Sequence, residues 1–106
     1  MNIKKLAGDL ELEEDEYLEL LELFIETARA DLEALEAAIE EGNADKAAKI
    51  AHTLKGASGS LGLMEFFEIV KDIEEKGRDN HLKGTRDSAQ TLKLRLDEIV
   101  RAVKEL

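Results

Sequence analysis

Apolar residues recur at alternating intervals of three and four along residues 13–41, the longest helix-like block of the sequence. This spacing places them on one face of an α-helix, because such a helix turns once in about 3.6 residues. A helix of this length hides its apolar face against other elements, so the block predicts a packed helical core. The core residues predicted for it are Leu18, Leu21, Ile25, Ala28, Leu32, Leu35 and Ile39.

Glycines and small polar residues divide the rest of the sequence into further blocks of the same kind. We expect a short helix over 3–8 and longer helices over 44–61, 64–76 and 85–105, with a polar turn over 77–84. Each long block has one apolar face at helical spacing. The residues of these faces are Ala47, Ala51, Leu54, Ser58 and Leu61, then Leu63, Phe66, Phe67, Val70 and Ile73, and finally Ala89, Leu92, Leu96, Ile99 and Val103.

The composition favours helices and excludes a β-sandwich or barrel in practice. The chain has no proline, and only 4% of its 106 residues are aromatic, whereas alanine, leucine, glutamate and lysine are abundant. These four residue types form helices well, and strands favour β-branched and aromatic residues. Long amphipathic helices joined by short connections pack as antiparallel neighbours. We therefore predict one all-α domain over residues 1–106, an antiparallel up-down four-helix bundle with a short extra N-terminal helix.

The charge of the chain disfavours nucleic acid and anionic membranes as partners. Its 15 basic and 25 acidic residues give a net charge of −10 at pH 7, which phosphate groups would repel. The excess of acid lies in residues 1–45. The chain has no cysteine and no apolar run near the roughly 18 residues of a membrane span. No apolar stretch follows Lys4 and Lys5, so we expect a cytoplasmic protein without a signal peptide or disulfides.

An unusual group of residues shares the outward face of the helix predicted over 44–61. At about 100° per residue, Lys49, Lys55, Gly56 and Gly59 all fall within about 60° of His52, away from the apolar face. A glycine inside a helix costs about 1 kcal/mol relative to alanine. Two glycines beside a histidine, in a chain rich in alanine, indicate a flat, solvent-facing surface on which another molecule can approach the imidazole.

The segment His52–Gly56, with the sequence HTLKG, is followed by SGSLG over residues 58–62. This pattern resembles the histidine-containing phosphotransfer (HPt) domains of bacterial two-component phosphorelays, and the resemblance covers nearly the whole chain. It implies that Nε2 of His52 accepts a phosphoryl group from a receiver-domain aspartate and passes it on. It also implies that Lys55 offsets the phosphoryl charge, and that Gly56 and Gly59, with Lys49 beside them, form the docking surface for the partner.

The same resemblance implies a phosphocarrier that is not an autonomous enzyme. The expected partners are response-regulator receiver domains, a sensor histidine kinase, or both, and we expect a monomer. No cofactor and no metal site are predicted for this chain, because Mg²⁺ in such systems belongs to the receiver. The chemistry agrees with the residues present, since an unperturbed imidazole is largely neutral at pH 7. Phosphoryl transfer depends mostly on positioning and electrostatic stabilisation.

A partner for His52 is expected on the following helix. In two antiparallel helices joined by a turn near residues 62 and 63, position 52 lies opposite about position 73. Glu74 is next to that position, at the edge of the apolar face. Its carboxylate can accept the Nδ1 proton of the imidazole and leave Nε2 free, and Lys71 is the nearest cationic alternative. His81 receives no role, because Lys83 follows it by only two residues within the predicted turn.

Two other functions remain open at this point. The chain can be the N-terminal phosphoacceptor domain of a chemotaxis-type histidine kinase, with which the acidic residues 13–24 and Glu74 are compatible. It can also be a non-catalytic helical adaptor in which His52 is incidental. Phosphorylation by an isolated kinase ATP domain identifies the first, and receiver binding that survives loss of His52 identifies the second.

Overall fold

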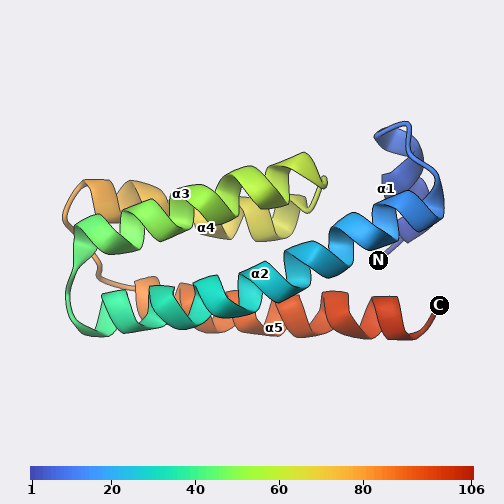
Figure 1. Ribbon diagram of the computed structural model, residues 1–106. Coiled ribbons are helices and arrows are strands. Elements are labelled where there is room, and N and C mark those ends of the chain that lie inside the picture. The colour runs from blue at the N-terminus through green and yellow to red at the C-terminus, as the bar shows by residue number, and fades with distance from the viewer.

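The computed structural model describes all 106 residues and consists of five helices with no strand (Figure 1). The all-α prediction is confirmed, and the helix bounds agree with the predicted blocks to within two residues. The helices are α1 (Ile3–Asp9), α2 (Glu14–Glu40), α3 (Ala44–Ser60), α4 (Met64–Arg78) and α5 (Thr85–Lys104).

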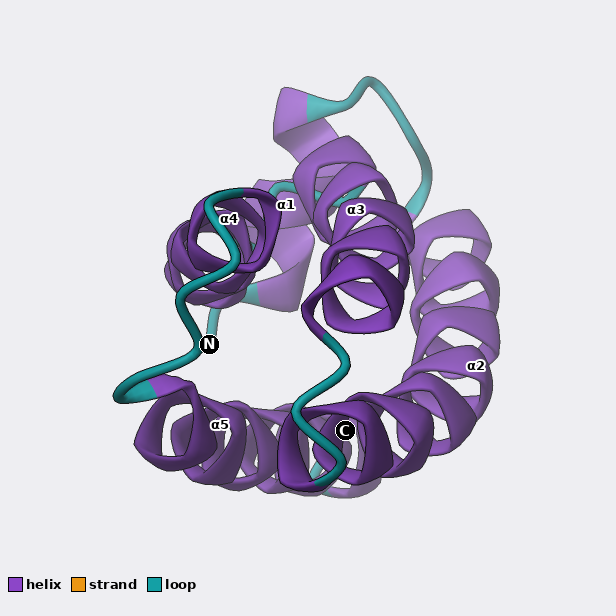
Figure 2. Cartoon of the chain, turned by 90° about the vertical axis from the view of Figure 1, so that its left-hand side faces the viewer, coloured by secondary structure: helices purple, strands orange, loops and turns teal.

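Helices α2 to α5 form an antiparallel bundle in which each helix packs on the next. The contacting pairs are α2 with α3, α3 with α4, α4 with α5, and α5 with α2. Figure 2, a view along the bundle, shows these four helices around a common interior. α1 packs on α2 at the end where both chain termini lie (Figure 1). None of the helices combines the length and the apolar character that a membrane span requires.

The core follows the predicted faces, with one shift along α2. The predicted faces of α3, α4 and α5 are buried except for Phe67 and Val103, which are partly exposed. On α2 the residues Leu18, Ile25 and Ile39 lie at the edge of the core and are only partly buried. α2 packs between α3 and α5 and also against α1, so its apolar stripe is wider than one seam. The buried residues of α2 are Tyr17, Leu21, Phe24, Ala28, Leu32, Leu35 and Ala38.

Tyr17 joins the start of α2 to the end of α3. Its ring is fully buried, and its hydroxyl donates a hydrogen bond of 2.7 Å to the carbonyl oxygen of Leu61. This bond satisfies one of the carbonyls that a helix leaves without an intrahelical partner at its C-terminal end. The burial raises the pKa of the Tyr17 phenol above its ordinary value. The end of the α3–α4 hairpin is therefore fixed against α2.

The end of α4 differs from the prediction. The sequence placed residues 77–84 in a turn, whereas α4 continues to Arg78, and Gly77 is a buried residue of that helix. A Cβ atom at position 77 would lie 3.0 Å from the carbonyl oxygen of Ala44 and 3.0 Å from Cβ of Ala48. Gly77 therefore allows α3 and α4 to approach closely and does not end the helix.

Candidate functional site

His52 lies in the middle of α3 and points out of the bundle. Its side chain is 62% exposed, whereas Ala51 and Leu54 beside it in the sequence are buried in the core. The apolar spacing of α3 explains this orientation, because it fixes which side of the helix faces the interior. The sequence-based placement of His52 on an outward face is thus what the structure has.

Glu74 of α4 contacts the imidazole of His52 from the buried side of the ring. Its Oε2 atom lies 2.9 Å from Nδ1 of His52, and only 2% of the Glu74 side chain is exposed. An ionised carboxylate only accepts hydrogen bonds, so the N–H at Nδ1 donates a hydrogen bond to Oε2 and keeps its proton. In the neutral imidazole this leaves Nε2 without a proton, with a lone pair on the exposed side. The contact predicted from the hairpin geometry is present.

Two cations hold the carboxylate of Glu74. Nζ of Lys55 lies 2.7 Å from Oε1, as an ion pair whose alignment is poor for a hydrogen bond, and Nη2 of Arg78 contacts Oε2. Burial by itself would raise the pKa of Glu74. The close contact with Lys55, the hydrogen bond from His52 and the positive charges of Lys55 and Arg78 outweigh this effect and lower the pKa of Glu74 below its ordinary value. Glu74 is therefore a carboxylate at neutral pH.

Arg78 is the site residue that the sequence interpretation missed. The sequence pattern predicts Arg78 in the turn after the helix, because Gly77 is predicted to begin that turn. The signal that could have found it is its position four residues after Glu74, since residues at that spacing share one face of a helix. Lys71, the cationic alternative, is exposed and is not among the partners of Glu74.

The two glycines beside His52 have different surroundings. Gly56 is exposed, and a Cβ atom added there would meet no other atom within 4 Å. Gly59 is half-buried, and a Cβ atom there would lie 3.1 and 3.2 Å from two ring carbons of Phe67. The prediction that both face solvent is right for Gly56 and wrong for Gly59. Gly59 lies on the α4 side of His52, where the partly buried ring of Phe67 covers it.

The other polar candidates lie apart from this cluster. Lys49 is 77% exposed and pairs with Asp45 at 3.1 Å, one turn earlier on α3. His81 follows α4 in a loop and is exposed, and its backbone nitrogen donates to the carbonyl oxygen of Lys76. No three histidine, aspartate or glutamate residues are grouped as metal ligands would be.

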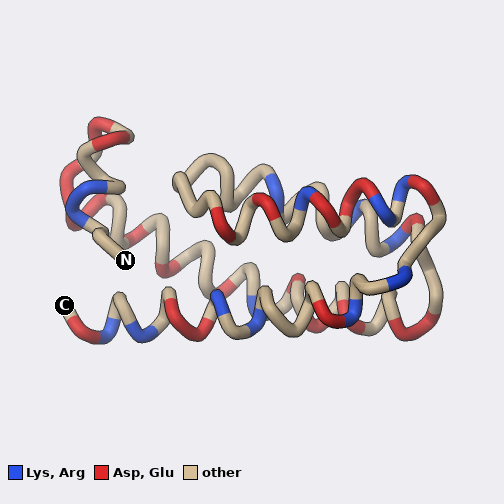
Figure 3. Tube along the Cα trace, turned by 180° about the vertical axis from the view of Figure 1, so that it is seen from behind, with Lys and Arg blue, Asp and Glu red and all other residues tan.

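An apolar groove of about 230 Å³ lies between α2 and α3, beside the His52 surface. Thr53 and Ala57 of α3 line it, together with Leu20, Leu23 and Thr27 of α2. Leu20 and Leu23 are 44% and 61% exposed, so apolar side chains of α2 face solvent along this groove. The sequence has no charged residue between Lys55 and Glu65, and Figure 3 shows the α3–α4 turn accordingly uncharged. His52 is therefore next to a largely apolar surface, on which Asp31 also lines the groove.

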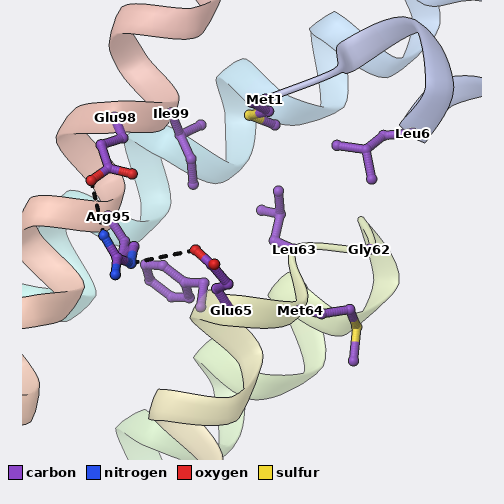
Figure 4. Close-up of a pocket in the computed structure, with 10 residues that line it drawn as sticks. Met1, Leu6, Gly62, Leu63, Met64, Glu65, Arg95, Glu98 and Ile99 are labelled. Carbon is purple, nitrogen blue, oxygen red and sulfur yellow. Dashed lines mark hydrogen bonds and ion pairs between the residues drawn. The ribbon is translucent and has the colours of Figure 1, made fainter.

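A second hollow lies near the α3–α4 turn and does not include His52. It has a volume of about 390 Å³ between the N-terminal segment, the turn and α5. Figure 4 shows Arg95 on one side of it, bound to Glu65 and Glu98, and apolar side chains such as Leu6 and Met64 on the other. Both acidic partners offset the charge of Arg95, so this hollow has no excess positive charge.

The comparisons with known proteins agree with this geometry. The family model described as "Hpt domain" matches residues 19–102. The structure is similar to the crystal structure of histidine-containing phosphotransfer protein B (HptB) from Pseudomonas aeruginosa PAO1. The TM-score is 0.84 and the sequence identity 28%, over 94% of this chain and 87% of that one. No curated protein sequence matches the chain. The match to the family model over most of its length shows that the chain belongs to the Hpt family, the histidine phosphotransfer domains of phosphorelays.

Proposed function

We propose that His52 is the phosphoryl acceptor and donor of this Hpt domain, working between receiver-domain aspartates. The observation that carries the proposal is the 2.9 Å contact between Nδ1 of His52 and the buried carboxylate of Glu74. It holds the proton on Nδ1 and leaves Nε2 free on the exposed side of the ring. A nucleophile oriented by an acceptor behind it is the usual arrangement for group transfer by histidine.

The transfer needs little from the chain beyond this positioning. The lone pair of Nε2 forms the new N–P bond, the O–P bond of the aspartyl phosphate breaks, and its electron pair leaves on the aspartate carboxylate. The ring gains positive charge, which Glu74 faces from the Nδ1 side. Lys55, on the same face as His52, offsets negative charge on the phosphoryl oxygens. The reverse sequence returns the group to a receiver, so the chain acts as a carrier and not as an autonomous enzyme.

The docking surface that we propose for the receiver combines Gly56 with the apolar groove. Gly56 leaves open space beside the imidazole, and the groove provides apolar area that a partner can bury. Lys49 lies at the border of this surface. Gly59 contributes to it indirectly, because the absence of a side chain at position 59 leaves room for the ring of Phe67. Mg²⁺ is supplied by the receiver, and this chain requires no cofactor. We propose that it acts in the cytoplasm as a monomer.

The test is phosphoryl transfer from a phosphorylated receiver. The protein is incubated with a receiver charged with acetyl phosphate, and acid-labile, base-stable phosphate on the protein is measured. We expect the wild-type protein to be labelled, His52→Gln to remain unlabelled with an unchanged melting temperature, and the matched control His81→Gln to be labelled as the wild type is. Labelling of His52→Gln would contradict the assignment.

The same experiment separates the two alternative functions. Phosphorylation by an isolated kinase ATP domain, with none from any receiver, would identify a phosphoacceptor domain of a chemotaxis-type kinase. Receiver binding without labelling of the wild-type protein, unaffected by His52→Gln, would identify an adaptor.

A further inference from the structure

Arg78 and His52 bind the same oxygen atom of a buried carboxylate. Nη2 of Arg78 contacts Oε2 of Glu74, which also accepts the hydrogen bond from Nδ1 of His52. The Arg78 side chain is 63% exposed, whereas that of Glu74 is 2% exposed. An ordinary ion pair between surface residues four apart contributes little to stability. The ion pair of Arg78 differs, because its acceptor, Oε2 of Glu74, also accepts the hydrogen bond from His52, the proposed phosphoryl acceptor.

One carboxylate oxygen can serve both donors. Such an oxygen has two lone pairs, so Arg78 and the imidazole each have one to bind. Lys55 holds the other oxygen, Oε1, at 2.7 Å. Each oxygen of the carboxylate therefore has a cation beside it, Lys55 at Oε1 and Arg78 at Oε2.

The charged residues around His52, which are Lys55, Glu74 and Arg78, have a net positive charge. Lys55 and Arg78 are cationic and Glu74 is anionic, so with a neutral imidazole the group has a net charge of +1. A phosphoryl group on a side chain adds about −1.5 to −2, while the ring that bears it gains up to one positive charge. Phosphorylation therefore brings the cluster close to neutrality. Without Arg78 the same step would leave it with a net negative charge.

We propose that Arg78 is a positioning residue that stabilises the phosphorylated form of His52, by holding Oε2 of Glu74 and by supplying the surplus positive charge. This inference rests on the proposed function of His52. The bonds that form and break are those of the transfer already described, and Arg78 gains and loses no proton in it. Its effect is on the equilibrium between aspartyl phosphate on the receiver and phosphohistidine on this chain.

The experiment measures that equilibrium. Phosphorylated receiver and protein are mixed at equal concentration, and the ratio of the two phosphoproteins is followed until it is constant. Loss of one unit charge from the partly solvated cluster around the imidazole changes such a ratio by up to about fivefold. We expect Arg78→Gln to shift the equilibrium by about that factor toward the receiver, and Arg78→Lys, which keeps the charge, to recover most of the loss.

The matched control is Lys76→Gln, two residues earlier on α4. It removes the same charge from the same helix, but Lys76 pairs with the exposed Asp72. Melting temperatures of all variants establish that the fold is kept. An equilibrium for Arg78→Gln equal to that for Lys76→Gln would overturn the proposal and leave Arg78 as a surface ion pair. If the wild-type protein accepts no phosphate at all, the proposed function of His52 fails instead, so the two failures are distinct.

Discussion

The carboxylate of Glu74 is only 2% exposed and accepts the hydrogen bond from Nδ1 of His52. Its position follows from two regularities, the antiparallel course of helices joined by a short turn and the place of Glu74 at the edge of an apolar face. Those regularities placed it opposite His52, where the structure has it. They could not predict that the carboxylate would be almost fully buried or shared with Arg78, because burial depends on how closely two helices approach.

The pH dependence of stability provides a test of this buried carboxylate. The native pKa of Glu74 is lowered, so its contribution to stability is fully present above the ordinary value of 4.5 and is lost as the pH falls through the native value. Glu74→Gln lacks this contribution at every pH. We expect the variant to be less stable than the wild type near pH 7, by about 1.5–3 kcal/mol for loss of bonds to a charged group.

The measurement is urea unfolding of both proteins between pH 3 and 7. The many other acidic residues titrate alike in the two proteins, so the difference between them isolates Glu74. The difference in the free energy of unfolding should shrink as the pH falls below about 4.5. A difference that is constant over this range would mean that Glu74 is not held as a carboxylate by its neighbours.

At the scale of the elements, the helices could be predicted well and the meaning of the glycines only in part. The existence and order of all five helices follow from apolar spacing and turn residues, which are local properties. Gly77 was interpreted as a helix end and Gly59 as solvent-facing, yet both lie where α3 and α4 pack closely. A glycine that ends a helix and one that admits a neighbouring helix look alike in a single sequence. The shift of the α2 core has a similar cause, since the width of its stripe is set by three neighbours.

Two alanine substitutions, one at an exposed glycine and one at a glycine between helices, are expected to change the stability of the fold in opposite directions. Helix propensity alone would make alanine stabilising at both positions, by up to about 1 kcal/mol. We expect that gain for Gly56→Ala, because the added Cβ meets open space. Gly77→Ala should instead destabilise the fold by about 1–3 kcal/mol, because the added Cβ presses on the backbone of Ala44 and on Ala48. Thermal and urea unfolding measure both, and a stabilised Gly77→Ala would mean that the helices can separate without cost.

At the scale of the whole molecule, the fold keeps stability and docking on different surfaces. The bundle buries one face of each helix, and α3 presents its other face, with His52 and Gly56, to solvent. The uncharged α3–α4 turn and the α2–α3 groove adjoin that face (Figure 3). The excess of acid lies in the first 45 residues, mainly along α2. A substitution on the outward face of α3 can therefore change binding without changing the core.

Gly56→Gln uses this separation to test the proposed docking surface. The new side chain meets no atom within 4 Å at its Cβ and extends into solvent, and glutamine is a better helix former than glycine. The variant should therefore melt at or above the wild-type temperature. The same side chain stands about 40° from His52 around α3, one turn away, where it blocks a receiver that must bring its aspartate to Nε2. We expect transfer from a phosphorylated receiver to fall at least about tenfold, the effect of losing about 1.4 kcal/mol of complementarity.

Two controls decide what such a loss would mean. Gly56→Ala adds only a methyl group at the same position and should transfer at close to the wild-type rate. Phosphoramidate, a small phosphodonor that needs no docking surface, should label Gly56→Gln and the wild type at similar rates if it labels either. A slow reaction with phosphoramidate as well would show that the substitution disturbs His52 itself. Transfer from the receiver at the wild-type rate would show that the partner docks elsewhere, and that the open space beside Gly56 has no part in recognition.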